Sequence, residues 1–238
     1  MIVSIHQPDY IPYLGLFYKM SRSDVFVFLD DAQYSNDNVH NWNRIKTPQG
    51  ECRLTVPVEQ HLGDLINHVR TRDELKWKEK HLKSIEMNYA RARHFGEIFP
   101  KFSELLTAEY SSIADMNVAI TSWIAGQFGF KAEIHRTSSM DIGTVREERV
   151  IDICVLMHGD EYISGNGARA YQVEEHFTSR GIKLTYTDYH PIEYKQLWMK
   201  QCGFLQNMSV LDYIFNCGFD WGYVRESVAA LNAKENHN

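Results

Sequence analysis

Two continuous apolar segments near the start of the chain, residues 2–5 (IVSI) and 25–29 (VFVFL), constrain the fold most. Both are rich in β-branched and aromatic residues, which is typical of strands buried on both faces. Between them, apolar residues recur at helical spacing and predict a helix over residues 14–21. A strand, a helix and a second strand form a βαβ unit, in which the two strands run parallel. The sequence therefore predicts an α/β protein with a parallel sheet.

The middle of the chain carries two further patterns. Residues 43–46 and 53–58 flank a Pro-Gln-Gly turn at residues 48–50, which predicts a hairpin. Residues 73–130 then show helical periodicity, and we expect breaks at Pro100 and at Ser111-Ser112. This segment is predicted to be a largely helical insertion that packs over the sheet or forms a lid.

From residue 134 the α/β pattern returns. We expect strands ending at residues 162–164 and covering 182–186, and helices over 149–156 and 171–179. Another helix is expected after an N-capping Ser209, and residues 233–238 are expected to fray. Without repeats or linkers, residues 1–238 are predicted to form one α/β domain with a Rossmann-like parallel sheet.

Composition excludes several classes of function. The 25 Lys and Arg residues face 31 Asp and Glu residues, and the resulting net charge of −6 argues against a broad nucleic-acid surface and against DNA as a partner. No apolar run approaches a membrane span and no signal peptide is visible, so we expect a cytoplasmic protein without membrane insertion. The four cysteines lack zinc-binding spacing, and no metal site is predicted.

Polar residues lie directly after each of the first two predicted strands. His6 and Gln7 follow the first strand, and Asp30 and Asp31 follow the second. In parallel sheets, ligands bind beyond the carboxyl ends of the strands, so these groups are candidates for one site. His6 can serve as an acid or base near neutral pH, or it can merely satisfy backbone groups at the strand end. Adjacent carboxylates can bind Mg²⁺, orient a hydroxyl or act as a base, and side-chain alternation is expected to turn one of them toward the cleft.

Two segments suggest anion binding. The turn Ser164-Gly165-Asn166-Gly167-Ala168-Arg169 follows a strand and precedes a predicted helix, where backbone N–H groups suit an anion, although a tight turn is the simpler use. Arg44 offers a planar guanidinium that can clamp a phosphate or carboxylate, although a lone Arg in a loop is commonly only solvated. The candidate catalytic residues are His6, Asp30 and Asp31, and the candidate substrate-binding residues are Gln7, Tyr10, Gln33, Tyr34, Asn43, Arg44, Ser164, Gly165, Asn166, Gly167, Arg169, Tyr171 and Gln196.

Five motifs, in order and over nearly the whole chain, resemble the WbqC-like family. They are IHQPxYxPxxGxFxK from Ile5 to Lys19, DxFVFLDDxQY from Asp24 to Tyr34, NR at Asn43-Arg44, YxSGxGARxY from Tyr162 to Tyr171, and SxxDxxFNxG from Ser209 to Gly218. The resemblance implies a bacterial protein of O-antigen and lipopolysaccharide biosynthesis. It further implies the attachment of glycine or another acyl group to an amino sugar. Tyr13 stands where many relatives carry Trp.

On this resemblance we expect a transferase that moves an acyl or aminoacyl group, such as glycyl, to an amino-sugar nucleotide or glycan precursor. His6 would be the acid or base, and Asp30 or Asp31 would orient it or deprotonate the incoming amine. Arg44 and the turn at 164–167 would hold phosphate or carboxylate. The donor would be an adenylate, an acyl-carrier-protein thioester or an aminoacyl-tRNA, and the net charge weighs against the tRNA.

Two alternatives stay open. One is an ATP- and Mg²⁺-dependent ligase that forms an acyl-adenylate, and the other is a non-catalytic module that binds a sugar nucleotide or carrier protein. The layout of the first strands is also similar to pantothenate synthetase, an enzyme of nucleotidylyltransferase-like fold that forms an adenylate. Its HxGH phosphate motif is absent here, because residues 12–15 (PYLG) occupy that place. Likeness of fold does not establish a reaction.

Overall fold

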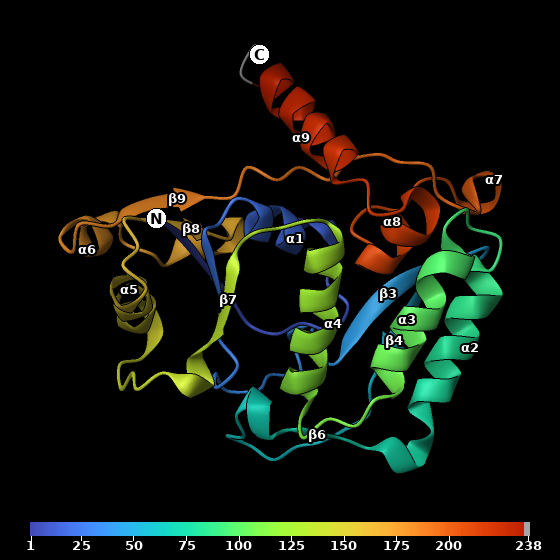
Figure 1. Ribbon diagram of the computed structural model, residues 1–238, viewed down its shortest axis with the longest axis horizontal. Helices are drawn as coiled ribbons and strands as arrows, with labels where there is room; N and C mark the ends of the chain where they lie inside the picture. The colour runs from blue at the N-terminus through green and yellow to red at the C-terminus, as the bar shows by residue number, and fades with distance from the viewer. Residues whose placement is uncertain (236–238) are drawn as a thin grey trace.

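The computed structural model describes residues 1–235, and over these residues it contains a five-stranded parallel sheet in the order β7-β2-β1-β8-β9 (Figure 1). The strands are β1 (Ile2–His6), β2 (Val25–Phe28), β7 (Glu133–Arg136), β8 (Glu161–Ser164) and β9 (Lys183–Tyr186). Helix α1 (Leu14–Ser21) connects β1 to β2, which pair in parallel from Val3↔Val25 to His6↔Phe28. The predicted α/β, Rossmann-like fold is confirmed.

The strand order reverses at β1. The chain first adds β2 and β7 on one side of β1, and then crosses to the other side to add β8 and β9. Helix α1, which follows β1, packs on one face of the sheet, while α6 (Glu174–Thr178), which follows β8, packs on the other. Connections that leave on opposite faces open a crevice between the carboxyl ends of the two strands. The topology thus places a ligand-binding crevice beside His6 and Ser164.

Alternation along β2 explains why its sequence is continuously apolar. Phe26 and Phe28 face the larger core, which also holds α1 and the helices of the middle segment. Val25 and Val27 face a second core against α6 and α5 (Arg146–Leu156). Because both faces are covered by helices, no position on the strand can be polar at low cost. In Figure 1, α5 and α6 lie at the opposite end of the molecule from α2 and α3.

Residues 73–130 are mostly helical, as predicted, and a hairpin precedes them in the chain. The hairpin pairs β3 (Trp42–Thr47) with β4 (Gly50–Thr55), and the helices are α2 (Trp77–Tyr89), α3 (Phe95–Thr107) and α4 (Ile113–Gln127). The break at Ser112 is confirmed, since its Oγ caps α4 by accepting from the Asp115 N–H at 3.1 Å. The expected break at Pro100 is wrong, because Pro100 lies inside α3. Four buried apolar residues of α3 hold that helix in the core, and this packing outweighs the local cost of proline.

The remaining elements are short, apart from the last helices. They are β5 (Val58–Glu59), η1 (Ile66–His68), β6 (Arg70–Thr71), η2 (Asp73–Leu75), η3 (Thr137–Ser139), η4 (Asn166–Ala170), α7 (Met199–Cys202), α8 (Val210–Cys217) and α9 (Trp221–Glu235). Ser209 caps α8 as predicted. Helix α9 reaches Glu235, so the fraying expected from residue 233 is absent up to there, and residues 236–238 lie outside the described residues. Within residues 1–235, no helix has the length and apolar character needed to cross a membrane.

Candidate functional site

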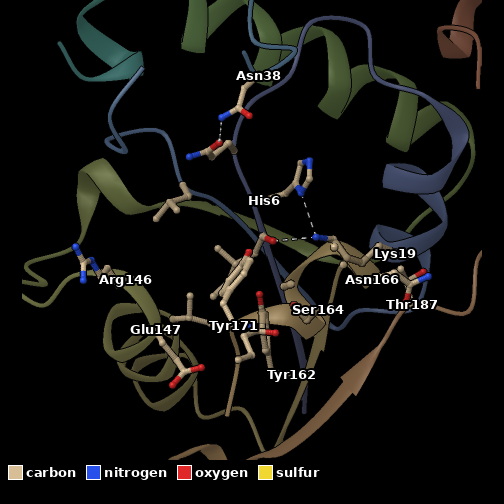
Figure 2. Close-up of a pocket in the computed structure, with 18 of the residues that line it drawn as sticks. His6, Lys19, Asn38, Arg146, Glu147, Tyr162, Ser164, Asn166, Tyr171 and Thr187 are labelled. Carbon is tan, nitrogen blue, oxygen red and sulfur yellow. Dashed lines mark hydrogen bonds between the residues drawn. The ribbon is translucent and has the colours of Figure 1, made fainter. Parts of the chain in front are cut away.

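A cavity of about 1010 Å³ opens at the carboxyl ends of β1 and β8, at the point where the strand order reverses (Figure 2). His6 and Gln7 line it from β1, residues 164–168 line it from β8, and Lys19 enters from α1. Its remaining lining includes four tyrosines, which are Tyr13, Tyr162, Tyr171 and Tyr189. Its volume suits a drug-sized or somewhat larger ligand. Two of the predicted segments, at His6-Gln7 and at Ser164–Gly167, therefore meet in one cavity.

Lys19 is a buried amine at the base of this cavity. Its Nζ donates to the carbonyl oxygen of Ile5 at 2.9 Å and to Nδ1 of His6 at 3.2 Å, and Figure 2 shows the amine between these two acceptors. The side chain is 4% exposed, because α1 packs directly against β1. Burial lowers the pKa of Lys19 from 10.5 to about 8. A substantial fraction of this amine is therefore neutral in mildly alkaline solution.

His6 connects Lys19 to a buried carboxylate. Its Nε2 lies 3.0 Å from Oδ2 of Asp9, and the other oxygen of Asp9 lies 3.3 Å from Nδ1 of His40. Burial and the charge of Lys19 lower the pKa of His6, which favours the neutral imidazole. Burial alone would raise the pKa of Asp9, but contacts with His40 and His6 outweigh it and lower the pKa to about 2. Asp9 is thus ionised and accepts the Nε2–H of His6.

These contacts fix the tautomer of His6 and the orientation of Lys19. Because Nε2 carries the proton toward Asp9, Nδ1 has a lone pair to accept from Lys19. A neutral lysine amine has two N–H bonds, and the Ile5 carbonyl and His6 Nδ1 account for both. The amine lone pair then occupies the remaining tetrahedral position. The arrangement can hold a neutral Lys19 ready to accept a proton from a group bound in the cavity.

The Gly-rich wall of the cavity differs from the predicted nest at a helix start. Residues Asn166–Ala170 form a short 3₁₀ helix, and Gly165 has ordinary extended angles, with φ −74° and ψ 147°. The helix expected over residues 171–179 starts only at Glu174. The wall instead presents Ser164, Asn166 and Tyr171 to the cavity. Arg169 stacks over the Tyr186 ring at 4.3 Å and does not line the cavity.

Asp30 and Asp31 lie outside the cavity lining. Asp30 is fully buried and accepts from Ser138 N–H at 2.9 Å, from Ser138 Oγ at 2.6 Å and from Arg136 at 2.7 Å. Burial opposes its ionisation, but these partners lower the pKa of Asp30 below its ordinary range. Asp31 pairs with Arg149 of α5. Asp30 thus links the end of β2 to β7, and Asp31 links it to α5. The carboxylate that orients His6 is Asp9.

The other candidates are distributed around the molecule. Gln196 belongs to a buried network, in which it accepts from Lys46 at 2.8 Å and donates to Asp212 at 2.8 Å. Tyr10 is buried and contacts His81 at 2.9 Å. Gln33 forms an isolated β-bridge with Leu65, and the ring of the buried Tyr34 packs on His40. Asn43 donates to the carbonyls of Tyr10 and Ile11. Arg44 pairs with Glu51 at 2.7 Å. None of these residues lines the main cavity.

Sequence reasoning did not single out several residues that line the cavity. The most important is Lys19, a lone cation in a helix whose other residues are mostly apolar and buried, and that contrast is the signal that could have found it. The others include Tyr13, which lies within the first motif, and a set from loops and helix starts outside the five motifs: Asn38, Arg146, Glu147, Gln172, Thr187 and Tyr189. Across the described residues, no group of three or more His, Cys, Asp or Glu side chains is arranged to hold a metal ion.

The fold and the cavity define a Rossmann-like α/β protein with a large cavity at the topological switch point. The chain belongs to the WbqC-like protein family, which it matches over residues 7–222. It is also 33% identical over 220 residues to the uncharacterized protein Rv1507c of Mycobacterium tuberculosis (strain ATCC 25618 / H37Rv), covering 91% of this chain and 94% of that protein. No solved structure matches the chain. These comparisons do not show the likeness to pantothenate synthetase.

Proposed function

We propose that this WbqC-like protein is an enzyme of surface-polysaccharide biosynthesis, such as that of O-antigen, which transfers an acyl or aminoacyl group to the amine of an amino-sugar nucleotide or related glycan precursor. The observation that carries the proposal is the buried Lys19 amine, held by Ile5 and His6 at the base of a large cavity at the sheet's switch point. Transfer to an amine requires a group that removes a proton from nitrogen, and Lys19 fits that role. Family membership supports the biological setting.

The cavity lining fits a sugar linked to a nucleotide. Tyrosines combine flat apolar rings with polar hydroxyls, and such surfaces stack on sugars and bases while hydrogen-bonding their edges. Tyr162 is buried beside the Ser164 wall, and Tyr171 is exposed at the mouth. Arg146, also at the rim, supplies a cation for a phosphate. The volume of about 1010 Å³ is larger than a single sugar needs, which favours a nucleotide-linked acceptor.

The chemistry follows from the orientation of Lys19. As the neutral amine of the acceptor bonds to the carbonyl carbon of the donor, the Lys19 lone pair takes one proton from that nitrogen. The bond from the carbonyl carbon to the leaving oxygen or sulfur breaks, the electron pair stays with that atom, and Lys19 returns the proton to it. An acyl group on lysine would be an unreactive amide, so Lys19 fits a base better than an acyl carrier. His6 and Asp9 act by positioning Lys19.

Deletion and complementation test the proposal. The gene is deleted in the organism that encodes it, and mass spectrometry of its surface glycans compares wild type, deletion, and strains complemented with the wild-type, Lys19→Met or Lys80→Met protein. Lys80 is an exposed residue of α2 and serves as the matched control. We expect the mass of one acyl group per repeat to be lost in the deletion and the Lys19→Met strain, and to be restored by wild type and Lys80→Met. Full restoration by Lys19→Met would refute the assigned role of Lys19, and an unchanged glycan in the deletion would refute the transferase.

A further inference from the structure

A second, smaller cavity of about 250 Å³ lies next to the first. Tyr13 lines both cavities, so its side chain belongs to the wall between them. Gly15 permits this position, because a Cβ there would lie 2.3 Å from the Tyr13 ring. The other side of the small cavity is formed by Trp42 and Arg44 of β3 and by Asn207. Arg44, which the sequence singles out as an anion clamp, therefore opens into a site of its own.

The small cavity is rich in hydrogen-bond donors. The Nε of Arg44 and the Nε1 of Trp42 are buried N–H groups that find no acceptor among the described residues. Buried donors without a partner are rare in folded proteins, and both of these belong to residues that line the small cavity. The Oδ1 of Asn43 accepts from the Arg44 backbone N–H at 2.8 Å and from neither of these two donors. No carboxylate lines this cavity.

The guanidinium of Arg44 is available to a ligand at low cost. Its Nη1 donates to Glu51 at 2.7 Å, but the two side chains are 37% and 40% exposed. Ion pairs between such exposed groups contribute little, so an anion in the cavity competes with Glu51 on favourable terms. A guanidinium binds phosphate oxygens through two parallel hydrogen bonds.

We propose that the small cavity binds a phosphate group of the acyl donor, through Arg44 and Trp42. This inference rests on the proposed function for the donor's role, but the phosphate site itself does not. An adenylate carries its phosphate directly on the acyl group, an aminoacyl-tRNA carries one on the terminal ribose, and a phosphopantetheine thioester carries one at the far end of the pantetheine arm. A phosphate held at Arg44 leaves the acyl end to pass Tyr13 and reach Lys19, since Tyr13 borders both cavities. The volume of about 250 Å³ holds a phosphate and a few further atoms, not a whole nucleotide.

Binding measurements on the purified full-length protein test the site. Calorimetric titrations use adenosine 5′-monophosphate, pantetheine 4′-phosphate and inorganic phosphate, and compare wild type with Arg44→Gln, Arg44→Lys, Glu51→Gln and the control Arg70→Gln, an exposed position on β6. We expect Arg44→Gln to weaken the best probe about tenfold or more, since it removes charge-assisted hydrogen bonds. Glu51→Gln should strengthen binding about two- to fivefold, because it frees Arg44 from a competing carboxylate.

The opposite signs of these two variants separate a phosphate site from a structural role for Arg44. If Arg44→Gln fails to fold, Arg44→Lys keeps the charge without the bidentate geometry and should show an intermediate loss. The probe that binds best identifies whether the donor is nucleotide-like or pantetheine-like. Unchanged binding in both Arg44 variants, or no gain in Glu51→Gln, would overturn the proposal. These probes carry no acyl group, so failure of the wild-type protein to bind them would overturn the phosphate site alone, whereas the glycan analysis tests the transfer reaction.

Discussion

Replacing Lys19 by Met should change how the stability of the protein depends on pH. Burial lowers the pKa of Lys19 from 10.5 to about 8, and a tenfold change in proton affinity corresponds to about 1.4 kcal/mol. Keeping the buried ammonium charged therefore costs the folded state about 3 kcal/mol below pH 8. Between pH 8 and 10.5 the unfolded chain binds more protons than the folded one, so the contribution of Lys19 to stability rises with pH across this window. The Met side chain has no such dependence.

Urea denaturation of both proteins at several pH values measures this effect. The free energy of unfolding of wild type, minus that of Lys19→Met, should rise by about 3 kcal/mol between neutral pH and pH 10.5. Other groups that titrate in this range are present in both proteins, so their contributions cancel to first order. The Lys80→Met control should stay parallel to wild type, because Lys80 is exposed. A constant difference between wild type and Lys19→Met would show that Lys19 titrates normally in the folded state and would remove the basis for its role as a base.

Three further predictions follow from the same contacts. Transferase activity should rise with pH through about 8, as Lys19 loses its proton. Asp9→Asn should move this rise to lower pH, because the charge of Asp9 raises the pKa of Lys19. A pH–rate profile that does not shift in Asp9→Asn would contradict the coupling between Asp9 and Lys19. Asp30→Asn should lower the free energy of unfolding, measured in urea, by about 3 kcal/mol, because it breaks the ion pair of a buried carboxylate with Arg136. The affinity for a cavity ligand, measured by calorimetry, should not change. A large loss of affinity would show that Asp30 takes part in ligand binding. Ser209→Ala should lower the free energy of unfolding by about 1 kcal/mol, because it removes the side-chain cap of α8. An unchanged thermal unfolding midpoint would contradict this prediction.

The strands that position the site were predictable because burial on both faces leaves a continuous apolar run. Residues 2–5 and 25–29 could be identified from that pattern, and the parallel βαβ connection followed from their short separation. The meeting of His6 with Ser164 was predictable in kind, since the carboxyl ends of parallel strands share one edge. The order of the strands, which makes β1 and β8 neighbours at the switch point, depends on long-range pairing that one sequence does not reveal.

The partners of the predicted carboxylates depend on information that only the packed structure contains. Asp30 lies just beyond the end of β2 as expected, but its partner Arg136 comes from β7, a strand that the sequence pattern did not predict. The short turn at Pro8 brings Asp9 back to His6, and the fold of the intervening chain brings His40 to Asp9. Such contacts depend on backbone turns and on segments distant along the chain. Local periodicity carries little information about either.

A crystal structure of the protein soaked with an amino-sugar nucleotide would show whether the acceptor amine lies beside Lys19. We expect density in the cavity between His6 and Ser164, with the amine nitrogen of the sugar within hydrogen-bond distance, about 3 Å, of the Lys19 Nζ. Density that places the sugar amine away from Lys19, or an empty cavity at a saturating concentration of the ligand, would contradict it.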